Sequence, residues 1–243
     1  MTISPETFVA EVATARPAAV KVFQRYGIDF CCGGKQPLRR ACETAGVPVE
    51  RVIAELQATG HRPDAGVQDW SVQPLSSLVR HISENYHAPQ AIELERLNAM
   101  MDKVERVHGE RWPALVPTLA EIVRGLTNEL LFHTNEEEDR LFPAILALER
   151  KEHVALHGRA LDRFLERLED EHFTVGRLLQ QMHLLTNGFL PPDGTCNTFR
   201  GLYHGLEELS STLKEHVHLE NHVLFPRAAA LGRTRADAVE GVS

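Results

Sequence analysis

A sequence pattern that occurs twice constrains the fold of this chain most strongly. Residues 133–143 read His-Thr-Asn-Glu-Glu-Glu-Asp-Arg-Leu-Phe-Pro, and residues 216–226 read His-Val-His-Leu-Glu-Asn-His-Val-Leu-Phe-Pro. In both copies a histidine is followed four positions later by a glutamate. Residues four apart lie on one face of an α-helix. The repeat therefore predicts two helices that each present an imidazole and a carboxylate on the same face.

Apolar residues recur at helical spacing along most of the chain from Pro74 onward. The pattern breaks at 108–113 and again at 190–195, and both segments contain glycine and proline. No alternation of polar and apolar residues competes with this helical pattern. We therefore predict an all-α fold in which four long helices form a bundle.

The spacing of the histidines places them at one level of this bundle. In an antiparallel helical hairpin, residues equidistant from the turn lie at the same height, because each helix rises ~1.5 Å per residue. The midpoint of His87 and His133 falls in the first break, and the midpoint of His172 and His216 falls in the second. We therefore expect four histidines and two glutamates at one level inside the bundle: His87, His133, Glu137, His172, His216 and Glu220.

Such a set of side chains is suited to two transition-metal ions. Imidazole and carboxylate ligands bind iron, manganese or zinc, and carboxylates can bridge two cations. We assign Glu137 and Glu220 as the bridges, which leaves positions for water or a diatomic ligand. Alternatively, each His–Glu pair is an ordinary surface pair that contributes a few tenths of a kcal/mol, but the repeat and the matching levels favour metal binding. The other acidic residues of 136–139 are expected on a solvated face. His218 and His222 are expected to be exposed or to lie just outside the ligands, where His222 could donate a hydrogen bond near the site.

The first sixty residues are predicted to form a separate small helical unit around a Cys31-Cys32-Gly33-Gly34 turn. Adjacent cysteines form a disulfide with each other only under strain, so the pair is better suited to thiol exchange, to a partner or to a metal. The alternative is that both are small buried residues beside a turn. The predicted organisation is a small helical domain, a linker, the bundle and a flexible tail, at residues 1–60, 61–73, 74–231 and 232–243.

Charge and composition exclude several classes of function. The net charge is −8 and no block of basic residues occurs, which argues against nucleic-acid binding. No segment approaches the ~18 consecutive apolar residues of a membrane span, and the first residues do not resemble a secretory signal. Four cysteines are too few and too unevenly spaced for a disulfide framework. We therefore expect a cytoplasmic protein that binds neither nucleic acid nor membranes.

The two motifs together indicate a family. The paired His-x-x-x-Glu-x-x-x-Leu-Phe-Pro motif on a helical bundle resembles the hemerythrin-like proteins. Together with Tyr-Gly-Ile-Asp-Phe-Cys-Cys-Gly-Gly-Lys at 26–35, it makes the chain similar, from about residue 5 to 230, to the iron-sulfur cluster repair di-iron proteins, also called repair of iron centres. The resemblance implies a hemerythrin-like four-helix bundle behind a small cysteine-bearing domain. It also implies a cytosolic, often homodimeric protein with two non-haem iron ions bridged by carboxylate and oxo groups.

The resemblance implies the same six metal ligands, namely His87, His133, Glu137, His172, His216 and Glu220. It also makes Cys31 and Cys32 candidate thiols for redox chemistry or iron transfer. The implied function is the repair of iron-sulfur clusters damaged by nitric oxide or oxidants, and the damaged iron-sulfur proteins are the implied partners.

Two mechanisms stay open, and a third function is the alternative. The protein could donate iron to a damaged cluster, or it could reduce nitric oxide, in which case it is an oxidoreductase of the nitric oxide reductase type. The alternative is a hemerythrin-like carrier or sensor of oxygen. In oxygen-carrying hemerythrins the third helix has two ligand histidines four apart, whereas here Gly176 lies four residues after His172. The missing imidazole favours reactivity or iron release over oxygen carriage.

Overall fold

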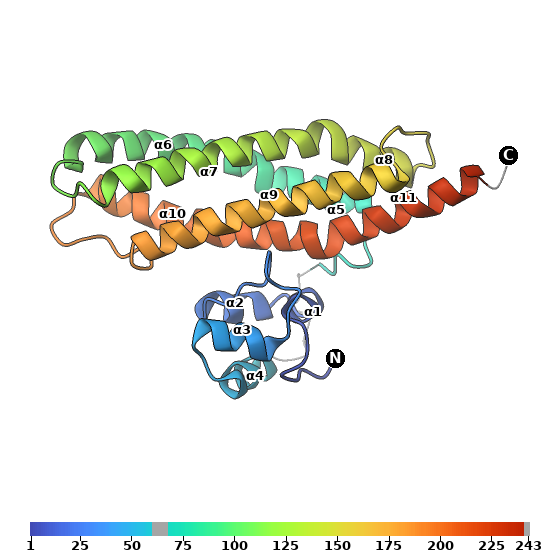
Figure 1. The fold of residues 1–243 in the computed structure, drawn as a ribbon, viewed down its shortest axis with the longest axis horizontal. Coiled ribbons are helices and arrows are strands. Elements are labelled where there is room, and N and C mark those ends of the chain that lie inside the picture. The colour runs from blue at the N-terminus through green and yellow to red at the C-terminus, as the bar shows by residue number, and fades with distance from the viewer. Residues whose placement is uncertain (60–67, 241–243) are drawn as a thin grey trace.

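The structure is a computed structural model that describes residues 1–59 and 68–240. Every regular element in these ranges is helical, and the single β-bridge joins Phe8 to Pro37. A small N-terminal domain precedes a long helical bundle and lies against one side of it (Figure 1). The predicted all-α fold with a small helical domain ahead of a helical bundle is therefore confirmed.

The N-terminal domain contains four short helices around its own apolar core. They are α1 (Val9–Ala15), α2 (Ala19–Arg25), α3 (Leu38–Ala45) and α4 (Val49–Ala58). Helix α3 ends at Gly46, whose φ of 68° is the left-handed conformation that glycine adopts without steric cost. Buried residues of these helices and of the loop between α2 and α3 pack together, and Val217 of the bundle joins this core.

The bundle consists of long helices that are mostly continuous through short π-helical segments. Its elements are α5 (Leu75–Ile82), η1 (Ser83–His87), α6 (Ala88–His108), α7 (Val116–Glu136), η2 (Glu137–Leu141), α8 (Phe142–Glu149), α9 (Gly158–Leu185), α10 (Asn197–Leu219), η3 (Glu220–Leu224) and α11 (Phe225–Glu240). Helix α6 packs against α7 and α10, and α7 packs against α9. The two chain breaks predicted from glycine and proline connect α6 to α7 and α9 to α10.

Each π-helical segment occurs where a proline follows in the chain. The helices after η1, η2 and η3 all have proline at their second residue, namely Pro89, Pro143 and Pro226. A proline has no N–H to donate and its ring clashes with the carbonyl four residues earlier, so α-helical hydrogen bonding cannot pass through it unchanged. A single wider turn absorbs this irregularity. The last residue of η1 is His87, and the first residues of η2 and η3 are Glu137 and Glu220.

The core of the bundle lies in two clusters on either side of these residues. One cluster contains buried residues of α6, α7 and α10 and of the C-terminal half of α9. The other contains buried residues of α5, α8 and α11 and of the N-terminal half of α9. The level predicted for the histidines and glutamates therefore separates two apolar cores.

The segment predicted as a flexible tail, residues 232–243, begins within a helix. Helix α11 continues to Glu240. Gly232 is buried, and a Cβ at this position would lie 2.8 Å from the Leu161 side chain, so the chain still packs on α9 there. Residues 241–243 lie outside the described residues, as does most of the predicted linker. The part of the linker at 68–73 is irregular and contains a turn at 70–72.

Candidate metal centre

The structure brings the six predicted ligand side chains together at one level of the bundle. Each is buried, with at most 4% of its surface exposed. The histidines come from η1, α7, α9 and α10, and the two glutamates begin η2 and η3. The i, i+4 spacing of each repeat places its imidazole and carboxylate on the inner face of one helix. The residues are His87, His133, Glu137, His172, His216 and Glu220.

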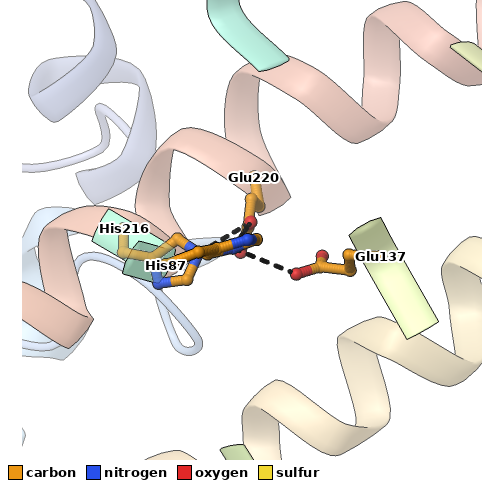
Figure 2. Close-up of side chains that lie close together, drawn as sticks. All are labelled: His87, Glu137, His216 and Glu220. Carbon is orange, nitrogen blue, oxygen red and sulfur yellow. Dashed lines mark hydrogen bonds and ion pairs between the residues drawn. The ribbon is translucent and has the colours of Figure 1, made fainter. Parts of the chain in front are cut away.

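These side chains form two groups that share both carboxylates. The first group is His87, Glu137, His216 and Glu220, and the second is His133, Glu137, His172 and Glu220; within each, the ligand atoms lie within 4.8 Å of one another. Figure 2 shows the first group, in which the imidazoles and the Glu220 carboxylate converge. The Nε2 atoms are 3.0 Å apart in the first histidine pair and 2.8 Å apart in the second.

The glutamate oxygens have the environment of metal ligands. Both oxygens of Glu137 and Oε2 of Glu220 are fully buried and accept no hydrogen bond from the described residues. The nearest groups to Glu137 Oε2 are the Nε2 atoms of His87 and His133, each 3.4 Å away. A buried carboxylate is costly unless a positive charge compensates it. The distances between paired Nε2 atoms also fit, because two ligands about 2.05 Å from one ion and at right angles to each other are about 2.9 Å apart. The residues present therefore fit a pair of metal ions.

Without a metal ion, protons on the neighbouring histidines compensate part of the negative charge of Glu137 and Glu220. Burial favours the neutral imidazole of His87, but the hydrogen bond to Glu138 and the nearby Glu220 carboxylate outweigh it and raise the pKa to about 9. Burial likewise opposes the charged form of His133, but the nearby charge of Glu137 and the hydrogen bond to Glu171 outweigh it and raise the pKa to about 10. Burial disfavours ionised Glu220, yet His216 and the other neighbouring imidazoles hold its pKa well below its usual range. A metal ion would displace these protons.

Three of the four histidines also bond to an outer acceptor through Nδ1. The pairs are His87 with Glu138 at 2.7 Å, His133 with Glu171 at 2.8 Å and His172 with Asn221 at 2.7 Å. Glu138 was expected on a solvated face; its side chain is partly exposed, and its carboxylate also accepts from the His87 ring. All three acceptors were missed by the sequence analysis. Their only signal in the sequence is position, since each adjoins a predicted ligand.

His218 is buried and His222 is half-buried, and both contact the N-terminal domain. His222 Nε2 donates to the carbonyl oxygen of Cys31 at 2.7 Å, and His218 Nδ1 lies 3.2 Å from the carbonyl oxygen of Phe30. Burial, aided by the nearby His222, lowers the pKa of His218 to about 4, so this imidazole is neutral near pH 7. The two histidines therefore dock the cysteine-bearing loop onto α10 and η3.

The cysteine pair reaches the bundle beside the candidate metal centre. The Cys32 sulfur lies 3.3 Å from the carbonyl oxygen of His172, and a Cβ at Gly176 would lie 3.2 Å from that sulfur. Cys31 is buried, and its hydrogen bond with Cys32 and its burial raise the pKa of its thiol well above the usual range. The Asp29 carboxylate accepts from the backbone N–H groups of the turn. All four cysteines of the chain are free.

Within 1–59 and 68–240, none of the helices combines the length and the apolar character that crossing a membrane requires.

Comparisons with known proteins match both parts of the chain. The ScdA_N model, described as a domain of unknown function (DUF542), matches residues 5–59. The hemerythrin model, described as a hemerythrin HHE cation binding domain, matches residues 77–228. The helical bundle is therefore hemerythrin-like, and its two buried His/Glu groups lie within a cation-binding domain.

Curated relatives cover nearly the whole chain. The iron-sulfur cluster repair protein YtfE of Yersinia pseudotuberculosis serotype IB (strain PB1/+) is 40% identical over 217 residues, which is 89% of this chain and 94% of the relative. YtfE of Yersinia pestis (strain Pestoides F) is also 40% identical over the same shares of the two chains. YtfE of Yersinia pseudotuberculosis serotype O:3 (strain YPIII) is 39% identical, again over 89% and 94%. The chain therefore belongs to the YtfE family of iron-sulfur cluster repair proteins.

Proposed function

We propose that the chain is a non-haem di-iron protein that repairs iron-sulfur clusters damaged by nitrosative or oxidative stress. Each of the two groups would hold one iron ion, and Glu137 and Glu220 would bridge the pair. The observation that carries this proposal is the sharing of both carboxylates between the two groups, since three of the four carboxylate oxygens accept no hydrogen bond from the described chain. Bound iron would supply a transferable metal ion and open positions for a diatomic ligand.

Iron donation is the route that the site supports best. The relatives are named for cluster repair, and damaged iron-sulfur proteins are the partners that this name implies for the present chain. The position four residues after His172, where an oxygen carrier has a further imidazole, is Gly176, and it faces the Cys32 sulfur. This neighbourhood supports thiol-assisted release of iron over reversible oxygen binding, with Cys31 and Cys32 as the candidate transfer thiols.

Metal content tests the site directly. Protein carrying Glu137→Ala and Glu220→Ala should lose the two iron ions per chain and the near-ultraviolet charge-transfer absorption of the parent protein. The matched control is Glu129→Ala, which removes an exposed carboxylate four residues before His133. Iron content that is unchanged by the double substitution would contradict the assignment of these residues as ligands.

Reconstitution tests the function. Iron-loaded protein, incubated anaerobically with a client that has lost iron from its cluster, should restore the client in proportion to the iron supplied. The metal-free protein should not. Equal recovery with metal-free protein would rule out iron donation.

Nitric oxide reduction is the second route, and the ligand count supports it. Six protein side chains over two ions leave coordination positions for a diatomic molecule. If this route operates, the reduced protein with an electron donor should form nitrous oxide over many turnovers. Formation of no more than one equivalent would exclude catalysis, while leaving iron donation intact.

The division into a domain at 1–60, a linker at 61–73 and a bundle at 74–231 remains a proposal, as does a homodimer. Limited proteolysis would test the first, because cleavage should concentrate in the linker. Sedimentation of the full chain would test the second.

A further inference from the structure

The internal repeat relates the outer acceptors of the metal centre as well as its ligands. His87 corresponds to His172. The Nδ1 atom of each bonds to the residue that follows a bridging glutamate, which is Glu138 for His87 and Asn221 for His172. This part of the centre is symmetric.

The other pair of histidines breaks the symmetry. His133 Nδ1 bonds to Glu171, which directly precedes His172. The corresponding residue, which directly precedes His87, is Tyr86. Its ring stacks on His216, with ring centroids 5.4 Å apart and planes at 20°. His216 Nδ1 is buried and has no hydrogen-bond partner anywhere in 1–59 or 68–240.

An outer acceptor matters because a metal-bound imidazole carries its proton on the other ring nitrogen. Bonding of that N–H to an acceptor fixes the ring and raises the basicity of the ligand, and loss of such a partner typically lowers metal affinity by about 10- to 100-fold. Both histidines of the second group have an acceptor. Only one histidine of the first group has one.

The hydrogen-bond acceptors of the second group, Glu171 and Asn221, also have more contacts that fix their position, and Glu171 is less exposed than Glu138. The side chain of Glu171 is 21% exposed, compared with 38% for Glu138. Arg167 bonds to Glu171 and fixes its carboxylate. Asn221 Nδ2 lies 3.4 Å from the carbonyl oxygen of Cys31, so the docked N-terminal loop holds this amide in place.

We propose that the two metal positions are unequal and that the ion held by His87 and His216 leaves first. Tyr86 is the residue that makes the first group weaker, because it supplies an aromatic face where the repeat otherwise supplies a carboxylate. This inference rests on the proposed function, since it takes both groups to bind iron. It assigns the transferable ion to the first group and a retained ion to the second.

Release kinetics test the inequality. The full chain is loaded anaerobically with two equivalents of Fe(II) and mixed with an excess of a chromophoric Fe(II) chelator in a stopped-flow spectrometer. The parent protein should release iron in two phases of equal amplitude, with rates at least about 10-fold apart. Tyr86→Glu should slow the fast phase about 10-fold or more, and Glu171→Gln should accelerate the slow phase until the two merge. The control Glu129→Gln should change neither phase.

Zinc provides a second readout that does not depend on repair activity. One equivalent of Zn²⁺ added to the metal-free full chain should shift the side-chain nitrogen resonances of His133 and His172 before those of His87 and His216. Release of both irons in one phase, or simultaneous zinc shifts of all four histidines, would overturn the inequality. An unchanged fast phase in folded Tyr86→Glu protein would overturn the role of Tyr86. Failure of the parent chain to bind two irons would instead refute the proposed function.

Discussion

Replacement of Glu137 by methionine should stabilise the metal-free protein and destabilise the metal-loaded one. Both oxygens of this side chain are buried without a hydrogen bond from the described chain. Replacing a whole buried ion pair by apolar side chains of similar volume is often neutral or stabilising by about 1–4 kcal/mol, and removing one partner has the same effect only if the other partner becomes neutral. Without the Glu137 carboxylate, His87 and His133 should release their protons, and the neutral imidazoles are less costly to bury than charged ones. At about 2–4 °C per kcal/mol for a chain of this size, the midpoint of thermal unfolding should rise by several degrees.

With metal bound, the parent protein should have the higher unfolding midpoint and Glu137→Met the lower one. A ligand at about 1,000 times its dissociation constant stabilises the folded state by about 4 kcal/mol. The parent protein should therefore gain about 8–16 °C when loaded with Fe(II). The variant lacks one of the two shared carboxylates and should gain much less.

Circular dichroism during anaerobic heating, with Fe(II) or with a chelator, measures both effects. Glu129→Met, on the exposed side of α7, serves as the matched control and should behave as the parent protein in both conditions. A lower unfolding midpoint for metal-free Glu137→Met would refute the reasoning, because it would mean that Glu137 is well paired without a cation.

Three further predictions concern the thiols and the ligand protons. Gly176→Ala should loosen the loop at Cys32, since the new Cβ would lie 3.2 Å from its sulfur; alkylation of Cys32 should accelerate several-fold, and an unchanged rate would contradict the contact. Metal affinity should rise with pH between 6 and 8, because the pKa of His87 is raised to about 9 and metal must displace its proton; we expect about tenfold per pH unit for each proton released, and a flat competition titration would exclude this. A hydrogen bond with His108 and the N–H groups of α10 lower the pKa of Cys196 to about 7. Iodoacetamide labelling of Cys196 should therefore be half-maximal near pH 7 and move to higher pH in His108→Ala; labelling that does not move would show that His108 has no such effect.

Local rules of helix geometry explain which parts of the centre could be anticipated. The convergence of His87 and His216 on one level follows from the helical period and from the constant rise per residue, and both are visible in the spacing of the repeat. The spacing does not predict which histidines lie next to each other. His87 faces His216 and not His133, because lateral packing of one hairpin on the other decides the partners, and spacing carries no information about it.

The features that the sequence did not predict lie in a run of acidic residues or depend on contacts between distant parts of the chain. In the sequence, Glu138 is indistinguishable from its acidic neighbours, and only the rotation of η2 decides that it reaches His87. The docking of His222 on Cys31 joins residues 191 positions apart, and no local pattern encodes such a contact. The repeated Leu-Phe-Pro was visible as a signature, but its structural meaning is the π-helical turn that it ends.

That turn divides three of the four long helices into two segments whose apolar faces are rotated relative to each other. A π-turn contains a residue more than an α-helical turn requires, and in an α-helix one residue corresponds to about 100° of rotation. The apolar stripe of α7 and that of α8 therefore both face the interior only because η2 stands between them. Deletion of one residue from η2 would restore a regular helix and swing Phe142 and Ile145, both now buried, away from the core. The irregularity that presents the bridging carboxylates thus also keeps the two apolar cores in register, so the bundle cannot straighten its helices without losing half of its interior.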